Sequence, residues 1–356
     1  MSSPGFPFSP WRLSVAPMLD GTDKHCRYLH RLLTRHTRLY TEMVTTGALL
    51  HGGADIERRL LRMDESEHPV ALQLGGSDPV ELAACACIGQ RWGYDEINLN
   101  CGCPSDRVQR GAFGACLMLQ PQRVADGVKA MLDAVAVPVT VKHRIGIDRE
   151  ESYSFVRDFV GAVAQAGCGV FIVHARNAWL EGLSPKENRE IPPLRYDVVY
   201  RLKRDFPDLT IVLNGGVTDD AQIATHLMHV DGVMIGRAAY HQPWWLSGWD
   251  EKFLGGQPCP LTVDSVEAVM VDYMQREARE DGTPWSAIAR HMLGLRHGQR
   301  GARLWRQVWS DHRLKALPPD QVWAKARACL LAVSTDAVTA PLPDKCRAEG
   351  WNDPLG

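Results

Sequence analysis

The chain has 356 residues, of which 45% are hydrophobic and 23% are charged, and its formal net charge is −2. This composition is typical of an ordinary globular protein, and without a global excess of positive charge any nucleic-acid contact has to be local. No apolar run approaches the roughly 20 residues that span a bilayer, and residues 1–11 lack the basic and apolar layout of a signal peptide. We therefore expect a cytoplasmic protein.

Eight short apolar runs with strand character recur along the chain. They are residues 13–18, 39–44, 70–74, 96–100, 137–143, 170–174, 210–214 and 232–235. Segments with a 3.6-residue apolar period lie between them, among them 80–92, 121–135, 153–166, 194–206 and 219–230. This alternation predicts an α/β fold, a (β/α)8 TIM barrel, because a doubly wound sheet usually needs a Gly-rich first turn and no G-x-G-x-x-G occurs.

The pattern changes after the eighth strand-like run. Helical periodicity continues over 263–281, 284–296, 302–312 and 320–334, with no strand pattern between these segments. We predict a barrel over 1–250, a linker over 251–256, a small α-helical domain over 257–338 and a loose tail over 339–356.

Polar residues and glycines gather at the carboxyl ends of the predicted strands. The motifs are Ala16-Pro17-Met18, Gln73-Leu74-Gly75-Gly76, Asn98-Leu99-Asn100-Cys101-Gly102-Cys103, Lys142-His143-Arg144, His174-Ala175-Arg176, Asn214-Gly215-Gly216 and Gly236-Arg237. Barrel enzymes keep their active sites at this face. Ordinary strand-to-loop transitions would explain one or two such ends but not seven, so an active site is expected here.

The last two motifs are typical of a phosphate cradle. Glycine backbone N–H groups and a cation such as Arg237 suit an anion in the loops after strands seven and eight. Lys142 leaves three possibilities open: a Schiff-base nucleophile, a hydrogen-bond donor to a cofactor, or a paired lysine. Met18 and Gln73 suit the face and the edge of a planar cofactor.

Strand parity separates the two thiols of the motif that follows the fourth predicted strand. Asn98 and Asn100 share one face of the strand, and Cys101 shares the other face with Leu99. If the asparagines face the site, Cys101 packs against helices and Cys103 is free to reach the site. An unperturbed thiol has a pKa of about 8.5, so it can act as a general acid near neutral pH.

The remaining cysteines show no metal-binding pattern. All ten are scattered through a long chain, which favours reduced thiols over a disulfide framework. The pairs Cys85/Cys87 and Cys101/Cys103 are spaced too closely for a zinc ribbon, and no matching Cys/His pair follows. We expect no metal.

The helical part carries a basic segment. Residues 290–315 hold seven Arg or Lys residues against one Asp, which favours an RNA or phosphate contact over a merely solvated face. Arg303 and Arg306 share one helical face, while Leu304, Trp305 and Val308 are expected to pack inward. Lys186 and Arg189, after strand six, could extend this basic surface.

These motifs resemble the flavin-dependent tRNA-dihydrouridine synthases, over about residues 14–306. Segments 42–47, 111–118 and 182–189 look like the A-type subfamily, which modifies D-loop uridines 20 and 20a. One departure is Cys101, where the family would have an apolar residue such as Val. Because Cys101 is expected on the outward face, the departure affects no catalytic group.

The resemblance implies a role for each matching position. FMN would contact Pro17, Met18, Leu19, Gln73, Lys142 and His174, and its phosphate would lie on Asn214, Gly215, Gly216, Gly236 and Arg237. Cys103 would be the proton donor, Asn100 would face the uridine, and Lys186, Arg189, Arg303 and Arg306 would contact tRNA.

The implied reaction is reduction of the C5=C6 bond of uridine in tRNA by FMN, with NADPH as the reductant and Cys103 protonating C5. We expect a monomer whose partner is tRNA, without contact to a membrane. Three alternatives remain: a flavin barrel that reduces a free pyrimidine, a flavin-free RNA-binding scaffold, and a Schiff-base lyase using Lys142. The free-pyrimidine enzyme is the nearest rival, but it gives the basic segment no task.

Overall fold

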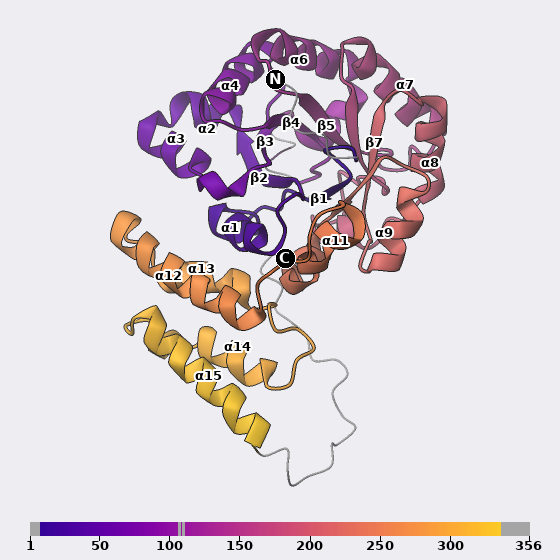
Figure 1. Cartoon of the computed structure of the whole chain (residues 1–356). Helices are drawn as coiled ribbons and strands as arrows, with labels where there is room; N and C mark the ends of the chain where they lie inside the picture. The colour runs from indigo at the N-terminus through magenta and orange to yellow at the C-terminus, as the bar shows by residue number, and fades with distance from the viewer. Residues whose placement is uncertain (1–7, 106–107, 109–110, 336–356) are drawn as a thin grey trace.

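Eight parallel strands form a barrel at the centre of the larger part of the molecule (Figure 1). The computed structural model describes residues 8–105, 108 and 111–335. The strands are β1 Leu13–Val15, β2 Leu39–Thr45, β3 Val70–Gly75, β4 Glu96–Cys101, β5 Val139–Arg144, β6 Val170–His174, β7 Thr210–Asn214 and β8 Gly232–Ile235. Backbone bonds join β1 to β2, with Val15 N–H on the Arg38 carbonyl at 3.0 Å, and close the ring.

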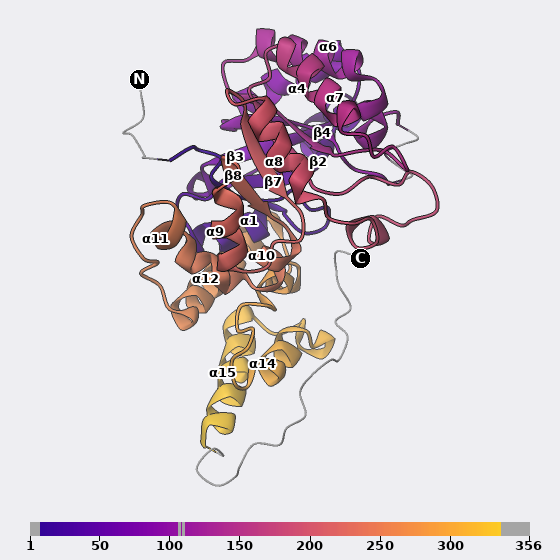
Figure 2. The same cartoon turned by 90° about the vertical axis from the view of Figure 1, so that its right-hand side faces the viewer.

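Helices cover the outside of the barrel (Figures 1 and 2). They are α1 Lys24–Leu33, α2 Thr46–His51, α3 Gly53–Leu61, α4 Pro79–Arg91, α6 Pro121–Ala134, α7 Tyr153–Gln165, α8 Tyr196–Asp205, α9 Asp220–Leu227, α10 Arg237–His241 and α11 Trp249–Phe253. Short 3-10 turns are η1 Glu65–Glu67, η2 Gly114–Leu119, η3 Glu187–Arg189 and η4 Pro243–Gly248. This arrangement is the predicted TIM barrel.

Alternate residues of each strand belong to different cores, as the pleat requires. Leu99, Cys101 and Val141 face the helices in the outer core, whereas Ala71, Ile172 and other small or apolar side chains fill the inside of the barrel. Cys101 is fully buried in the outer core. The parity prediction that separated Cys101 from the site is therefore confirmed.

The second part of the molecule is helical throughout the described residues (Figure 1). It consists of α12 Val263–Asp281, α13 Trp285–Ala289, η5 Arg290–Met292, α14 Ala302–Trp309, η6 His312–Leu314 and α15 Pro319–Thr335. Trp285, Trp305 and Trp309 supply much of its core, with the rings of Trp285 and Trp309 edge to face at 5.7 Å. Aromatic side chains bury a large area each, so three of them stabilise a small core.

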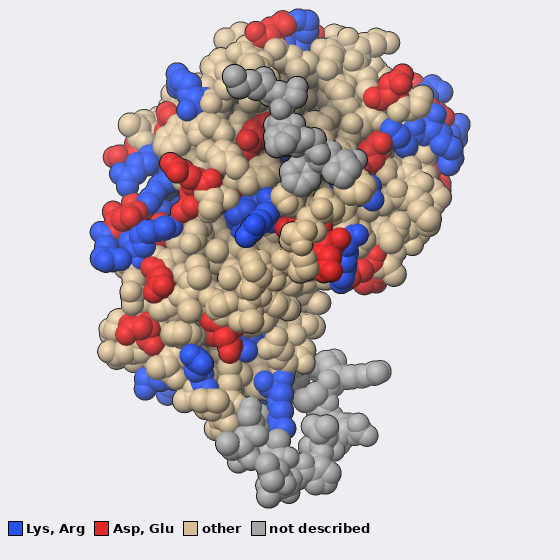
Figure 3. Space-filling view, in the orientation of Figure 1, with Lys and Arg blue, Asp and Glu red and all other residues tan. Residues whose placement is uncertain are grey.

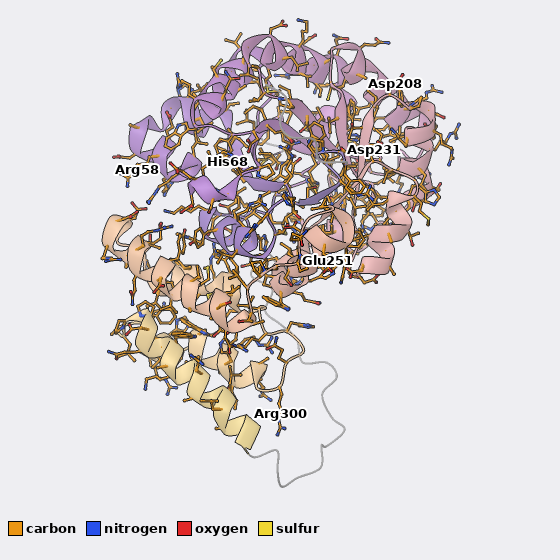
Figure 4. All side chains as sticks on the ribbon, viewed as in Figure 1. Arg58, His68, Asp208, Asp231, Glu251 and Arg300 are labelled. Carbon is orange, nitrogen blue, oxygen red and sulfur yellow. The ribbon has the colours of Figure 1, made fainter. Side chains whose placement is uncertain are left out.

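Ion pairs hold the helical part against the barrel. Lys24 of α1 pairs with Glu277 of α12 at 2.5 Å, and Arg58 of α3 pairs with Asp281 at 2.6 Å. Figure 3 shows basic and acidic side chains interspersed on the side where α3 meets α12, and Figure 4 labels Arg58 there. Asp23, the N-cap of α1, pairs with Arg290 at 2.7 Å. This interface fixes the helical part beside the first strand-end loop.

Most predicted elements agree with the structure, and the differences have local causes. The last three strands have the predicted bounds, but β1 ends at Val15 because residues 16–22 turn, with Met18 N–H bonded to the Thr22 hydroxyl at 3.0 Å. The helix predicted over 284–296 is shorter. The α-helix ends at Ala289 and continues as the 3-10 turn Arg290–Met292, and at Gly294 the chain passes so close to the His241 carbonyl oxygen that a Cβ would overlap it.

The predicted limits of the domains remain predictions. The helix α11 ends at Phe253 and α12 begins at Val263, and the tail predicted over 339–356 lies outside the described residues. Within the described part of the chain, no helix is both long and apolar enough to cross a membrane.

Candidate active site

The loop that carries Cys103 is held in place by the side chain of Asn100. The Asn100 amide oxygen accepts the backbone N–H groups of Gly102 and Cys103, both at 3.0 Å. The thiol of Cys103 is half-buried and donates to the Ser105 hydroxyl, with the two atoms 3.5 Å apart. The Cys103 carbonyl accepts from Ala115 N–H at 2.9 Å. The backbone of the predicted acid is therefore fixed from both sides while its thiol is still reachable.

Asn100 is buried and makes more hydrogen bonds within the protein than the sequence indicated. Its side chain is 8% exposed, and its amide nitrogen donates to the Gln73 amide oxygen at 2.9 Å. Gln73, predicted to contact FMN, is 1% exposed and lies beside it inside the barrel. The structure thus brings Gln73, Asn100 and Cys103 together at the mouth. A contact from Asn100 to uridine stays a prediction.

Arg144 ties the Cys103 loop to the long loop after β6. Its Nε donates to the Gly102 carbonyl at 3.2 Å and its Nη1 donates to the Asn188 carbonyl at 2.9 Å. Burial lowers the pKa of Arg144 to about 9. Asn188 is buried, and its side-chain oxygen stabilises the loop after β6 by accepting the Trp179 N–H at 2.8 Å. The sequence analysis gave neither residue a role, although Arg144 stands in a strand-end motif.

Lys142 lies two residues before the end of β5 and His174 ends β6, and both are half-buried side chains of the mouth. Burial, and then the charge of Arg144, lower the pKa of Lys142 to about 7. The same two causes lower the pKa of His174 well below its ordinary value. Neither side chain forms a hydrogen bond or ion pair with another residue in the part of the chain that the structure describes. Both polar groups are thus available to a ligand.

The glycines after β7 form a close backbone approach. Gly215 has φ +114° and Gly216 has φ +74°, which favour glycine. A Cβ on Gly215 would lie 2.7 Å from the His174 ring, and one on Gly216 would lie 2.5 Å from Leu194. Tyr196, which the sequence analysis missed, donates its hydroxyl to the Gly215 carbonyl at 2.9 Å. These residues shape a cradle that a single added methyl group would fill.

The other predicted cofactor residues surround the same mouth. A Cβ on Gly236 would make ordinary van der Waals contact with Ala16 at 3.8 Å and with the Met18 sulfur at 4.0 Å, so the loop after β8 lies beside the loop after β1. Arg237 pairs with Glu190 at 2.6 Å, and Asn214 donates to the Met234 carbonyl at 2.8 Å. Pro17 and Met18 are half-buried in the loop after β1, and Leu19 is 63% exposed.

The four predicted tRNA contacts lie on two different parts of the molecule. Lys186 is exposed and Arg189 half-buried in the loop after β6, whereas Arg303 is exposed and Arg306 half-buried on α14. In Figure 1 the helix α14 lies in the helical part, away from the barrel. Figure 4 labels Arg300 in this outer region, just before α14.

The structure corrects two details of the basic segment. Arg290 pairs with Asp23, and Arg296 is buried against Glu267 at 2.5 Å, so these two charges hold the fold together. Less positive charge is therefore available to an outside partner than the sequence count implied. Leu304 is 42% exposed, so the prediction that it packs inward is wrong, because Trp305 and Trp309 occupy the inner face of α14.

The fold and the site together define the class of protein. A TIM barrel whose strand ends present a thiol, a lysine without a partner among the described residues, and a glycine cradle is a barrel enzyme with its site in the C-terminal face. The chain belongs to the dihydrouridine synthase family (Dus), whose family model matches residues 14–327, and this family consists of flavoprotein oxidoreductases.

Curated relatives match nearly the whole chain. The tRNA-dihydrouridine(20/20a) synthase of Escherichia coli is 57% identical over 306 residues, covering 86% of this chain and 87% of that protein. The enzyme of the same name from Pseudomonas aeruginosa is 56% identical over 315 residues, covering 88% and 94%.

Among solved structures, 2-naphthoyl-CoA reductase in complex with 2-naphthoyl-CoA is similar in fold. The TM-score is 0.53 at 10% identity, over 67% of this chain and 50% of that chain. This chain therefore spans about half the length of that protein, and the likeness concerns the fold alone.

Proposed function

We propose that this chain is a tRNA-dihydrouridine synthase that reduces the C5=C6 bond of uridines 20 and 20a in tRNA, with FMN as cofactor and NADPH as reductant. One observation carries the proposal: the Cys103 thiol, the Lys142 amine and the glycine cradle follow or lie on strand ends that share one barrel mouth. The names of relatives that are 56–57% identical support the substrate and the two positions.

The residues of the mouth fit FMN. Gly215 and Gly216 let the backbone after β7 pass close to the His174 ring, and Lys142 and His174 have polar atoms without a partner among the described residues. The residues that would hold FMN are Pro17, Met18, Leu19, Gln73, Lys142, His174, Asn214, Gly215, Gly216, Gly236 and Arg237. When bound and reduced, the flavin supplies the hydride for the uracil ring.

Cys103 would complete the reduction as the general acid that gives a proton to C5. The Asn100 amide holds the loop, so the thiol would approach a bound uracil without a large loop movement. The uridine has to leave its stack to reach the mouth, at a cost of a few kcal/mol. Lys186, Arg189, Arg303 and Arg306 would offset this cost by contacting the tRNA backbone.

Three further properties belong to the proposal: the location, the part that binds tRNA and the oligomeric state. A protein that modifies tRNA meets its substrate in the cytoplasm, which we propose as its location. We also propose that the helical part grips tRNA and that the enzyme acts as a monomer, because the chain itself contributes every residue that the mechanism uses.

The function is tested by mapping dihydrouridine by mass spectrometry in tRNA from a strain that lacks this enzyme, with and without added protein and NADPH. We expect dihydrouridine at positions 20 and 20a only with the protein present. Unchanged tRNA would refute the proposed function, and reduction at other positions would refute the proposed site.

The variant Cys103→Ala tests the proposed role of Cys103 as the general acid. We expect this variant to bind FMN and to be reduced by NADPH like the wild type, while dihydrouridine formation falls by about 100-fold or more, the usual contribution of a general acid. The control is Cys87→Ala, because Cys87 lies on α4, away from the strand ends, with its thiol on the Ala134 carbonyl. Turnover by Cys103→Ala that matches Cys87→Ala would eliminate Cys103 as the acid.

A further inference from the structure

A continuous row of hydrogen bonds runs through the inside of the barrel to the Cys103 loop. We name it the interior chain; its members, in order, are Glu96, Thr140, Asn98, Gln73 and Asn100. The Thr140 hydroxyl donates to Glu96 at 2.5 Å, and the Asn98 amide nitrogen donates to Thr140 at 2.7 Å. Gln73 donates to Asn98 at 2.7 Å, and Asn100 donates to Gln73 at 2.9 Å. All five side chains are buried.

Every bond of the interior chain has the same direction, and Glu96 determines that direction. The Glu96 carboxylate can only accept, so the Thr140 hydroxyl has to donate to it and accept from Asn98. This leaves the Asn98 amide oxygen for Gln73 and, in turn, the Gln73 amide oxygen for Asn100. An amide group has one donor end and one acceptor end, so the orientation of each amide fixes the orientation of the next one.

The common direction of these hydrogen bonds has its effect at the loop of Cys103, the proposed general acid. Because the Asn100 nitrogen is turned toward Gln73, its oxygen faces the Gly102 and Cys103 N–H groups and accepts both at 3.0 Å. If the Asn100 amide were reversed, its NH2 group would meet two donors. The orientation of one amide therefore decides whether the Cys103 loop is held.

Fixed donors at the far end of the chain hold Glu96 in place. Its Oε2 atom accepts the Trp11 indole N–H at 2.7 Å and pairs with Arg38 at 3.2 Å, and both of these groups are donors only. Its Oε1 atom accepts the hydroxyls of Thr140 and of Tyr40, the latter at 2.8 Å. Burial and the nearby Glu96 raise the pKa of Tyr40 well above its ordinary value, so this hydroxyl remains a donor.

We propose that Glu96 is a positioning residue for the dihydrouridine synthase reaction: through the interior chain it sets the orientation of Asn100 and so holds the loop of Cys103. This inference rests on the proposed function for its effect on catalysis, but not for its effect on the loop. Glu96 lies at the start of β4 and the loop follows the end of the same strand, so the effect would run the length of the barrel interior.

Glu96→Gln is the variant that separates orientation from packing. Trp11 and Arg38 require an oxygen at the Oε2 position, so the new NH2 group takes the Oε1 position and points at Thr140. The Thr140 hydroxyl then loses its acceptor unless it donates to Asn98, and that change reverses every amide as far as Asn100. Either the chain keeps its order with an unsatisfied hydroxyl, or it reverses and releases the Cys103 loop.

The double variant Glu96→Gln with Asn98→Asp restores the order without restoring the original charge at position 96. The new carboxylate at position 98 accepts from both Thr140 and Gln73, so Gln73 and Asn100 return to their original orientation. The matched control is Tyr40→Phe, which removes a donor from the same Glu96 oxygen and leaves the chain as it is. A purely structural role of Glu96 would give no rescue.

The main measurement is hydrogen exchange at the Gly102 and Cys103 amides of the flavin-loaded protein, resolved by peptide or by NMR. We expect Glu96→Gln to accelerate exchange at these amides by about tenfold, which corresponds to the loss of an ordinary hydrogen bond. The double variant should return to within about threefold of the wild type, and Tyr40→Phe should match the wild type. Wild-type exchange in Glu96→Gln, or equal acceleration in Tyr40→Phe, would overturn the inference.

A second variant and a second readout cover other outcomes. If Glu96→Gln does not fold, Thr140→Val breaks the interior chain without touching the ion pair, and unchanged exchange in that variant would overturn the inference. Single-turnover dihydrouridine formation by reduced enzyme should follow the exchange results. If the wild type forms no dihydrouridine while the exchange results hold, the proposed function fails and the interior chain stands. If the wild type is active and Glu96→Gln changes neither readout, only the interior chain fails.

Discussion

Gly215→Ala tests the glycine cradle, because the structure separates two costs of the added methyl group. The first cost is backbone strain, since φ +114° at Gly215 is a conformation that alanine rarely adopts, at about 1–3 kcal/mol. The second is steric: the new Cβ would lie 2.7 Å from Cδ2 and 3.0 Å from Nε2 of His174. Relief requires His174 to move, and this side chain is a proposed FMN contact.

We therefore expect Gly215→Ala to weaken FMN binding by about tenfold or more, since each tenfold change in affinity corresponds to about 1.4 kcal/mol. The assay is titration of the apoprotein with FMN, followed by quenching of flavin fluorescence, together with denaturant unfolding of the apoprotein. The matched control is Gly282→Ala at the end of α12, where φ is +68° and no atom lies within 4 Å of an added Cβ.

The control carries strain alone, so Gly282→Ala should lower the free energy of unfolding by about 1–2 kcal/mol and leave FMN affinity unchanged. Equal FMN affinity in the two variants would refute a role of the glycine cradle in FMN binding. Loss of FMN from Gly282→Ala would show that general destabilisation, and not the site, controls flavin binding.

Two further predictions concern charge. Arg303→Ala and Arg306→Ala should each weaken tRNA binding and reduce the salt dependence of log K by slightly less than one, about 0.7–0.9, whereas Arg157→Ala, whose guanidinium pairs with Asp158 on α7, should leave the slope unchanged. Asp23→Asn keeps an N-cap for α1 but loses the ion pair with Arg290, so we expect a loss of about 1–3 kcal/mol near pH 7 in denaturant unfolding. Burial alone would raise the pKa of Asp23, but the charge and hydrogen bond of His291 hold it well below its ordinary value. The stabilisation is therefore fully present above the unfolded pKa of about 4 and is lost gradually as pH falls from there through the lower folded pKa. A difference between variant and wild type that does not shrink as pH falls below about 4 would contradict this reasoning, as would a tRNA salt slope that stays constant in both arginine variants.

The number of strands and the faces of each strand were readable from the sequence. Apolar runs such as 170–174 and 210–214 coincide with β6 and β7 because a buried parallel strand has to be apolar over its whole length. The side-chain period of two is local geometry, and so it placed Cys101 in the outer core before any tertiary contact was known. The grouping of the strand-end residues followed from the fold class, because all parallel strands end at one face of the barrel.

Ion pairs and hydrogen bonds between residues distant in sequence became visible only in the tertiary structure. Arg290 looked like part of a tRNA surface, but its acid partner, Asp23, lies 267 residues away, and no local pattern could predict that pair. An amide at a strand end has several possible partners, and the loop geometry gave the Asn100 oxygen to Gly102 and Cys103. The sequence by itself determined which chemical groups stand at the mouth. The packing of eight strands around one interior determined which way those groups point, because hydrogen-bond direction depends on neighbours that only the closed barrel brings together.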